Sequence, residues 1–205
     1  KLMNGYLDSS SNKPQATVSI AGLPSSFTDA GYTVVVYFGS DGNGRTGKVT
    51  VEGGETYSFS SFSEQAGDFP AAYVQTTDTG DGEPEANFAV WSGLNSANVN
   101  ITVDRGSNNS GIHGFQIIGA TPPPPPAASL SVSFSSDRAD AEFGAGETAG
   151  APGYETSGWN DIASVLGDGA TDGVTSPFAG QLTDSNGNAI EGATVEWTTA
   201  NSWNT

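Results

Sequence analysis

The sequence predicts an all-β protein, built as an antiparallel β-sandwich or jelly roll. Apolar and polar residues alternate with a period of two through most of the apolar segments, which is the pattern of half-buried strands. Glycine-rich turn sequences separate these segments, and the 205 residues include 28 Gly and 11 Pro. One segment with some helical character, 159–166, is brief and bounded by glycines. Many short strands joined by turns are typical of sandwiches and jelly rolls.

The individual strands are expected where β-branched and aromatic residues cluster between turn signals. Residues 33–38 form a nearly continuous run of such residues, so this strand is expected at the centre of a sheet and buried on both faces. Trp91, at the end of another apolar run, is expected in the core. The predicted strands are 16–20, 32–38, 48–51, 57–62, 71–76, 87–91, 99–103, 115–118, 130–134, 178–182 and 194–198.

Five consecutive prolines at 122–126 mark a boundary. Such a run forms a stiff polyproline II rod, so we expect a linker at 121–127 between a first segment, 1–120, and a second segment, 128–205. The second segment has few predicted strands and a long stretch rich in Gly, Ala, Thr and Asp at 144–176. It is therefore expected to be unable to bury a core alone.

The charge and composition of the chain exclude several classes of binding partner and site. Lys and Arg total 6 against 23 Asp and Glu, which gives a net charge of −17 and argues against nucleic-acid binding. The chain has no Cys, so disulfides and thiolate metal sites are excluded. No apolar run approaches the ~20 residues that cross a membrane, so no membrane span is expected. The opening KLMNGYLD resembles the interior of a domain, and we expect a mature or excised piece of a longer extracellular or cell-surface protein.

Several strings resemble a known module. LMNGYLD, VVVYFGSDGNGRTGKV, FAVWSGLNSANVNITV and GIHGFQII resemble the later half of a lectin-like (concanavalin A-like, jelly-roll) β-sandwich that recurs in large secreted and surface proteins of bacteria. The strings at 130–161 and 182–205 resemble its earlier half, so the two halves stand in inverted order. The resemblance implies a sandwich fold but no established activity. Residues 182–198 are also similar to the turn and strand of bacterial immunoglobulin-like repeats.

The inverted order leaves two arrangements open. In one, the second segment of each unit completes the first segment of the next unit, which gives a head-to-tail fibre or surface array. In the other, both segments of one chain fold together as a permuted domain. The expected function is a non-catalytic extracellular structural repeat whose partners are neighbouring copies of itself. The alternative is a carbohydrate-binding or adhesion module with Ca²⁺ as its candidate cofactor and a polysaccharide as its candidate partner.

Catalytic residues are not expected. The single histidine, His113, lies beside an apolar strand, where a histidine is more often a satisfied core residue than a general base. Glu191 and Glu196 could in principle act as paired carboxylates, but both are expected on a solvent-facing row. The chain has no cysteine nucleophile and no GxSxG sequence. The prediction is therefore that the protein is not an enzyme.

Calcium is the metal that the sequence could bind. Oxygen-rich loops suit Ca²⁺, which takes six to eight oxygen ligands, although the same residues also form ordinary solvated turns. The best candidate is DTGDGEPE at 78–85, which carries four carboxylates without EF-hand spacing. The candidate ligands are Asp78, Asp81, Glu83 and Glu85.

Sugar binding would use exposed aromatic rings with polar neighbours. Tyr154, Trp159 and Trp203 stand in loop-like contexts, with Asn160 and Asp161 beside the second of them. These residues are the candidate ligand-binding group. The alternative is that the aromatic rings close the edge of the sandwich or a joint between modules.

Overall fold

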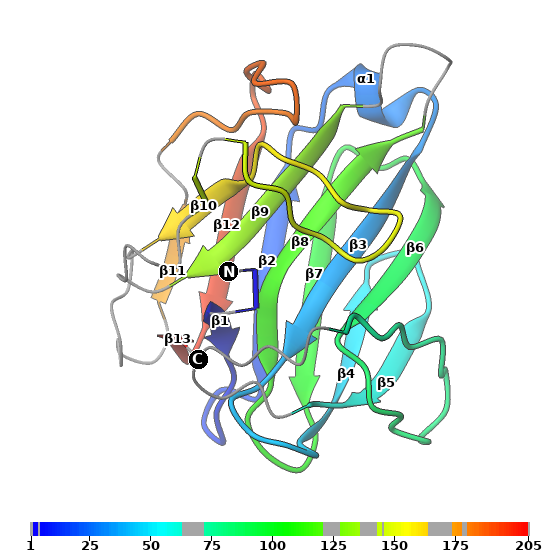
Figure 1. Cartoon of the computed structure of the whole chain (residues 1–205), viewed down its shortest axis with the longest axis vertical. Helices are drawn as coiled ribbons and strands as arrows, with labels where there is room; N and C mark the ends of the chain where they lie inside the picture. The colour runs from blue at the N-terminus through cyan, green and yellow to red at the C-terminus, as the bar shows by residue number, and fades with distance from the viewer. Residues whose placement is uncertain are drawn as a thin grey trace.

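The computed structural model describes residues 2–3, 5–62, 72–120, 128–135, 143–144, 146–163, 174–177 and 180–204. They form two β-sheets that pack face to face (Figure 1). Both sheets are largely antiparallel, and the described residues include one helical turn, α1 (Ser25–Thr28). The predicted all-β sandwich is confirmed, with a shape compatible with a jelly roll.

The strands divide between a seven-stranded and a six-stranded sheet. The first sheet contains β1 (Gly5–Asp8), β3 (Tyr32–Gly39), β6 (Phe88–Leu94), β8 (Gly111–Gly119), β9 (Ser129–Ser135), β10 (Asn160–Ala163) and β13 (Asn201–Asn204). The second sheet contains β2 (Gln15–Ala21), β4 (Thr46–Val51), β5 (Thr56–Ser60), β7 (Val99–Arg105), β11 (Val174–Pro177) and β12 (Thr194–Thr199).

Strand β8 organises the first sheet. Along one side it pairs with β3, which in turn pairs with β6, and along the other side it pairs with both β9 and β1. Beyond them, β10 runs parallel to β9, and β13 runs antiparallel to β1. The second sheet has the order β11-β12-β2-β7-β4-β5. The central, doubly buried position predicted for 33–38 is confirmed, because β3 has partners on both sides and is buried along nearly its whole length.

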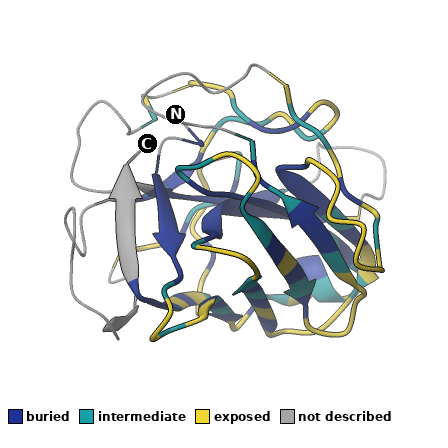
Figure 2. Ribbon diagram, turned by 90° about the horizontal axis from the view of Figure 1, so that it is seen from below, coloured by how far each residue is buried: buried dark blue, intermediate teal, exposed yellow. Residues whose placement is uncertain are grey.

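The main core lies between the sheets, and Figure 2 shows the burial concentrated along the strands. In β2, Ala16, Val18 and Ile20 are buried while their neighbours are at least partly exposed, as a period of two requires. The two sequence segments share this core. The ring of Phe134 lies 6.3 Å from that of Phe115 and 5.9 Å from that of Trp197.

Two strand predictions were wrong over the described residues. Residues 72–76 form only an isolated bridge at Gln75 in place of a strand, and residues 180–182 are not in a strand. The chain there makes single bridges and side-chain hydrogen bonds, which sequence alternation does not distinguish from a ladder. Strands β1, β10, β11 and β13 were not predicted. Each has four residues, too few for a clear period-two signal.

The two segments interlock within one chain. Strand β9 pairs with β8, β12 with β2, and β13 with β1. The structure thus contains the arrangement in which residues 129–204 complete the sheets of residues 5–119. The predicted proline linker, 121–127, lies outside the described residues. No helix in the described part of the chain is long and apolar enough to cross a membrane.

Candidate functional site

The predicted ligand-binding aromatic Trp159 lies on the outer face of the first sheet, against β3. It is 8% exposed, and its ring stacks on that of Phe143 with centroids 5.4 Å apart and planes 18° apart. The ring of Tyr37 lies 6.2 Å away, and the indole Nε1 donates a hydrogen bond to the Thr156 carbonyl over 3.0 Å. Trp159 therefore packs between Phe143 and the sheet.

The polar residues beside Trp159 are also engaged internally. Asn160 Nδ2 donates to the carbonyls of Ser131 and Thr183 over 3.0 and 2.9 Å, and Asp161 Oδ2 accepts from the Phe143 amide over 2.7 Å. These contacts agree with the alternative in which this group closes the sandwich, and ligand binding by it stays a prediction.

Tyr154 and Trp203 complete the predicted group. Tyr154 is partly buried in the same outer cluster, and its carbonyl accepts a hydrogen bond from Gln116 over 2.9 Å. Trp203 does not lie in a loop, because its backbone is in β13, opposite Tyr6 of β1. The expected loop context was wrong because the pairing partner of this short strand is remote in sequence.

The predicted calcium ligands lie along an exposed loop. Asp78 Oδ1 accepts a hydrogen bond from the Gly80 amide over 2.7 Å, and the Asp81 carboxylate accepts one from Lys48 Nζ, also over 2.7 Å. The hydrogen bond and charge of Lys48 lower the pKa of Asp81. Glu83 has a positive φ of 47° and Glu85 forms a bridge with Ser60. Over the described ranges, no three His, Asp or Glu side chains are grouped so that they could hold a metal ion.

The other predicted carboxylates and the histidine occupy their expected environments. Glu191 and Glu196 are exposed, and Glu196 alternates with buried Val195 and Trp197 along β12. His113 is buried in β8, with Nδ1 2.8 Å from the Gly5 carbonyl and its ring 5.2 Å from that of Tyr6. The structure thus places His113 in packing beside β1.

A buried carboxyl at the β1 joint was not predicted. Asp8 is 1% exposed, and its Oδ2 accepts a hydrogen bond from Asn109 over 3.0 Å. Burial, and secondarily the negative charge of Asp41, raises the pKa of Asp8 to about 7, while the nearby Arg45 acts in the opposite direction. The Asp8 carbonyl accepts from the Ala200 amide over 2.9 Å, so this carboxyl sits where the two segments meet.

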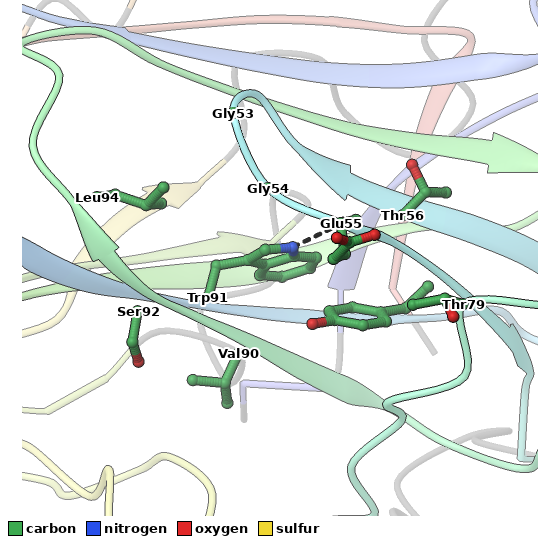
Figure 3. A pocket seen from close by; sticks show the side chains of 10 residues that line it. Gly53, Gly54, Glu55, Thr56, Thr79, Val90, Trp91, Ser92 and Leu94 are labelled. Atoms are coloured by element: carbon green, nitrogen blue, oxygen red, sulfur yellow. Dashed lines mark hydrogen bonds between the residues drawn. The ribbon is translucent and has the colours of Figure 1, made fainter.

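A second unpredicted feature is a hollow at the opposite edge of the sandwich, between β5 and β6 (Figure 3). Its volume is about 590 Å³. Trp91 was expected in the core and is indeed 4% exposed, yet its ring edge lines this hollow. The lining residues are Gly53, Gly54, Glu55, Thr56, Tyr57, Thr79, Val90, Trp91, Ser92 and Leu94.

Comparison with models of protein families, with curated proteins and with solved structures gave no match for this chain. The assignment of function therefore rests on the geometry above.

Proposed function

We propose that this chain is a non-catalytic structural repeat of an extracellular fibre or surface array, in which consecutive copies join head to tail by completing one another's β-sandwich. The observation that carries the proposal is the interlocking of the two segments. Three strands from residues 129–204 each pair with a strand from residues 5–119.

Neither segment has a complete sandwich by itself. Without the second segment, β2 loses its partner β12, and β8 loses β9. The core also loses Val132, Phe134 and Trp197, which are at most 2% exposed. Open strand edges and uncovered apolar surface recruit a complementary strand, and every copy of the chain carries one. The same contacts form whether the strands come from the same copy or from the next.

The geometry of β1 and β13 allows the chain to continue from copy to copy. The two strands are antiparallel, with Gly5 opposite Asn204. The last residues of β13 therefore lie beside the first residues of β1, as the two arms of a β-hairpin do. A short connection would lead from β13 of one copy into β1 of the next copy without altering the sandwich.

The sequence resemblance supports the same proposal. Lectin-like sandwich modules recur in large secreted and surface proteins of bacteria. If a tandem array of such modules is divided inside a module, each repeat starts with the later half of one module and ends with the earlier half of the next. The net charge of −17 keeps such a repeat soluble outside the cell. We assign no residue a catalytic role.

Disulfide trapping tests the exchange, because the natural chain has no cysteine. Ser19 of β2 and Glu196 of β12 are register partners from different segments. We expect a mixture of a Ser19→Cys chain and a Glu196→Cys chain to form disulfide-linked heterodimers on assembly, and the doubly substituted chain to form a ladder of oligomers on a non-reducing gel.

A matched control uses Lys48→Cys with Asp104→Cys, since these register partners both lie in the first segment and should link only within one chain. Purely intramolecular linkage of Ser19→Cys with Glu196→Cys, with no heterodimer at any concentration, would overturn the proposal. Electron microscopy of the native material should then show no fibre or array either.

A further inference from the structure

We infer that the hollow between β5 and β6, lined by Tyr57 and Trp91, is a binding groove for a neutral carbohydrate chain. No part of the assembly proposal assigns a role to this edge of the sandwich, which lies away from the β1–β13 pair (Figure 1). The groove belongs to a single chain, so its occupancy does not depend on head-to-tail joining.

The aromatic wall of the groove is held in place before any ligand arrives. Trp91 Nε1 donates a hydrogen bond to the Glu55 carbonyl over 2.7 Å, as Figure 3 shows, and its ring lies 5.2 Å from that of Tyr57. A Cβ on Gly54 would lie 2.3 Å from Trp91 Cδ1, so the glycine is what lets the turn approach the indole. Tyr57 is only partly buried and lines the groove, so its ring is the one we assign to stacking against a sugar ring.

Hydroxyl groups surround this wall. Thr79 and Ser92 are exposed among the lining residues, and Ser92 Oγ accepts a hydrogen bond from Thr33 Oγ1 over 3.1 Å on the side of β6 that faces away from Trp91 (Figure 3). Thr56 Oγ1 lies 2.9 Å from Thr50 Oγ1 at the other side. An aromatic floor with the exposed residue Thr79 beside it and hydroxyls at its two rims suits the two faces of a sugar ring, one apolar and one polar.

Charge selects among carbohydrates. Glu55 is the one ionisable carboxylate among the lining residues, and the lining includes no Lys, Arg or His. The whole chain also carries a net charge of −17. Uronic acids, sulfated sugars and phosphate-bearing ligands are therefore repelled, whereas neutral hexoses and N-acetylhexosamines are not. The volume of about 590 Å³ falls within the usual range for small-molecule sites.

Titration of the 205-residue chain with neutral hexasaccharides (cellohexaose, mannohexaose and chitohexaose) tests the inference. The readout is the shift of the Trp91 indole N–H signal in a ¹H–¹⁵N spectrum, assigned by its loss in Trp91→Phe. We expect at least one hexasaccharide to move this signal with a Kd below roughly 1 mM, and polygalacturonic acid to leave it in place.

Three variants separate binding from folding. Tyr57→Ala should weaken binding about tenfold or more because it removes the stacking ring, while Tyr57→Phe should keep affinity within about threefold. Tyr154→Ala, in the aromatic cluster on the other face, should leave binding unchanged. The inference is overturned if no neutral hexasaccharide binds the folded chain, if the acidic polymer or an extended peptide binds in its place, or if Tyr154→Ala weakens binding and Tyr57→Ala does not. The disulfide-trapping result bears on assembly alone, so the two proposals fail independently.

Discussion

Asp8 accepts a hydrogen bond from Asn109 across 3.0 Å in a site where the aspartate is almost fully shielded from water. The amide satisfies one carboxylate oxygen but brings no positive charge, and Asp41 adds negative charge nearby. The carboxyl therefore favours its protonated form at a place where the backbone of β1 also meets the chain after β12.

Stability should fall as the pH rises towards and above 7. The folded pKa of Asp8 is about 7 and lies above its ordinary value of 3.8. The stabilisation linked to its proton is complete below pH 3.8 and is lost as the pH rises through 7. The loss is on the order of 3–4 kcal/mol, from roughly three pKa units. Urea unfolding at pH 5 and pH 8 should show about 3 kcal/mol of this loss, because roughly two of the three pKa units lie between these pH values. Asp8→Asn should flatten this difference, whereas Asp29→Asn, at an exposed position, should not.

Trp197→Ala should destabilise the sandwich by about 3–5 kcal/mol, because it removes a large ring that is 2% exposed and packs on Phe134. Thermal or urea unfolding followed by circular dichroism gives the change. The neighbouring exposed residue provides the control, since Glu196→Ala should stay within about 0.5 kcal/mol of the natural chain. Equal effects of the two substitutions would contradict the assignment of β12 faces.

Gly111→Ala should disrupt the pairing of β8 with β1. A Cβ at Gly111 would lie 1.8 Å from the Leu7 carbonyl oxygen, which is backbone and has no room to move without breaking the ladder. Gly119, in the same strand, is the matched control, because its Cβ would meet nothing closer than 3.5 Å. Hydrogen exchange of the β1 amides should accelerate in Gly111→Ala and remain unchanged in Gly119→Ala; acceleration in both would argue against a local clash.

The sequence predicted the strands that have strong local signals. The run of β-branched and aromatic residues at 33–38 identified β3 and its central position, and alternation identified β2, β7 and β12. Strand β13 could not be predicted in the same way, because four residues carry too little periodicity and their partner β1 is remote in sequence. Long-range pairing decides such strands.

The candidate sites likewise have some features that the sequence predicts and others that depend on contacts between remote residues. Burial of Trp91 followed from its apolar neighbours, but its place in a groove depends on the β4–β5 turn bringing Gly54 and Tyr57 against it. The buried carboxyl of Asp8 gave no local signal, since its environment is assembled from residues such as Asp41 and Asn109 on other loops.

The pairing of β1 with β13 and of β2 with β12 also limits when these two ladders can form during synthesis of the chain. Strands β1 and β2 leave the ribosome before residues 194–204, so these ladders cannot close until the later residues have emerged, and contacts between such distant residues form slowly. Until then β1 and β2 lack their partners β13 and β12. A nascent chain that stops before residue 194 therefore exposes strand edges of β1 and β2 that residues 194–204 cover in the folded chain.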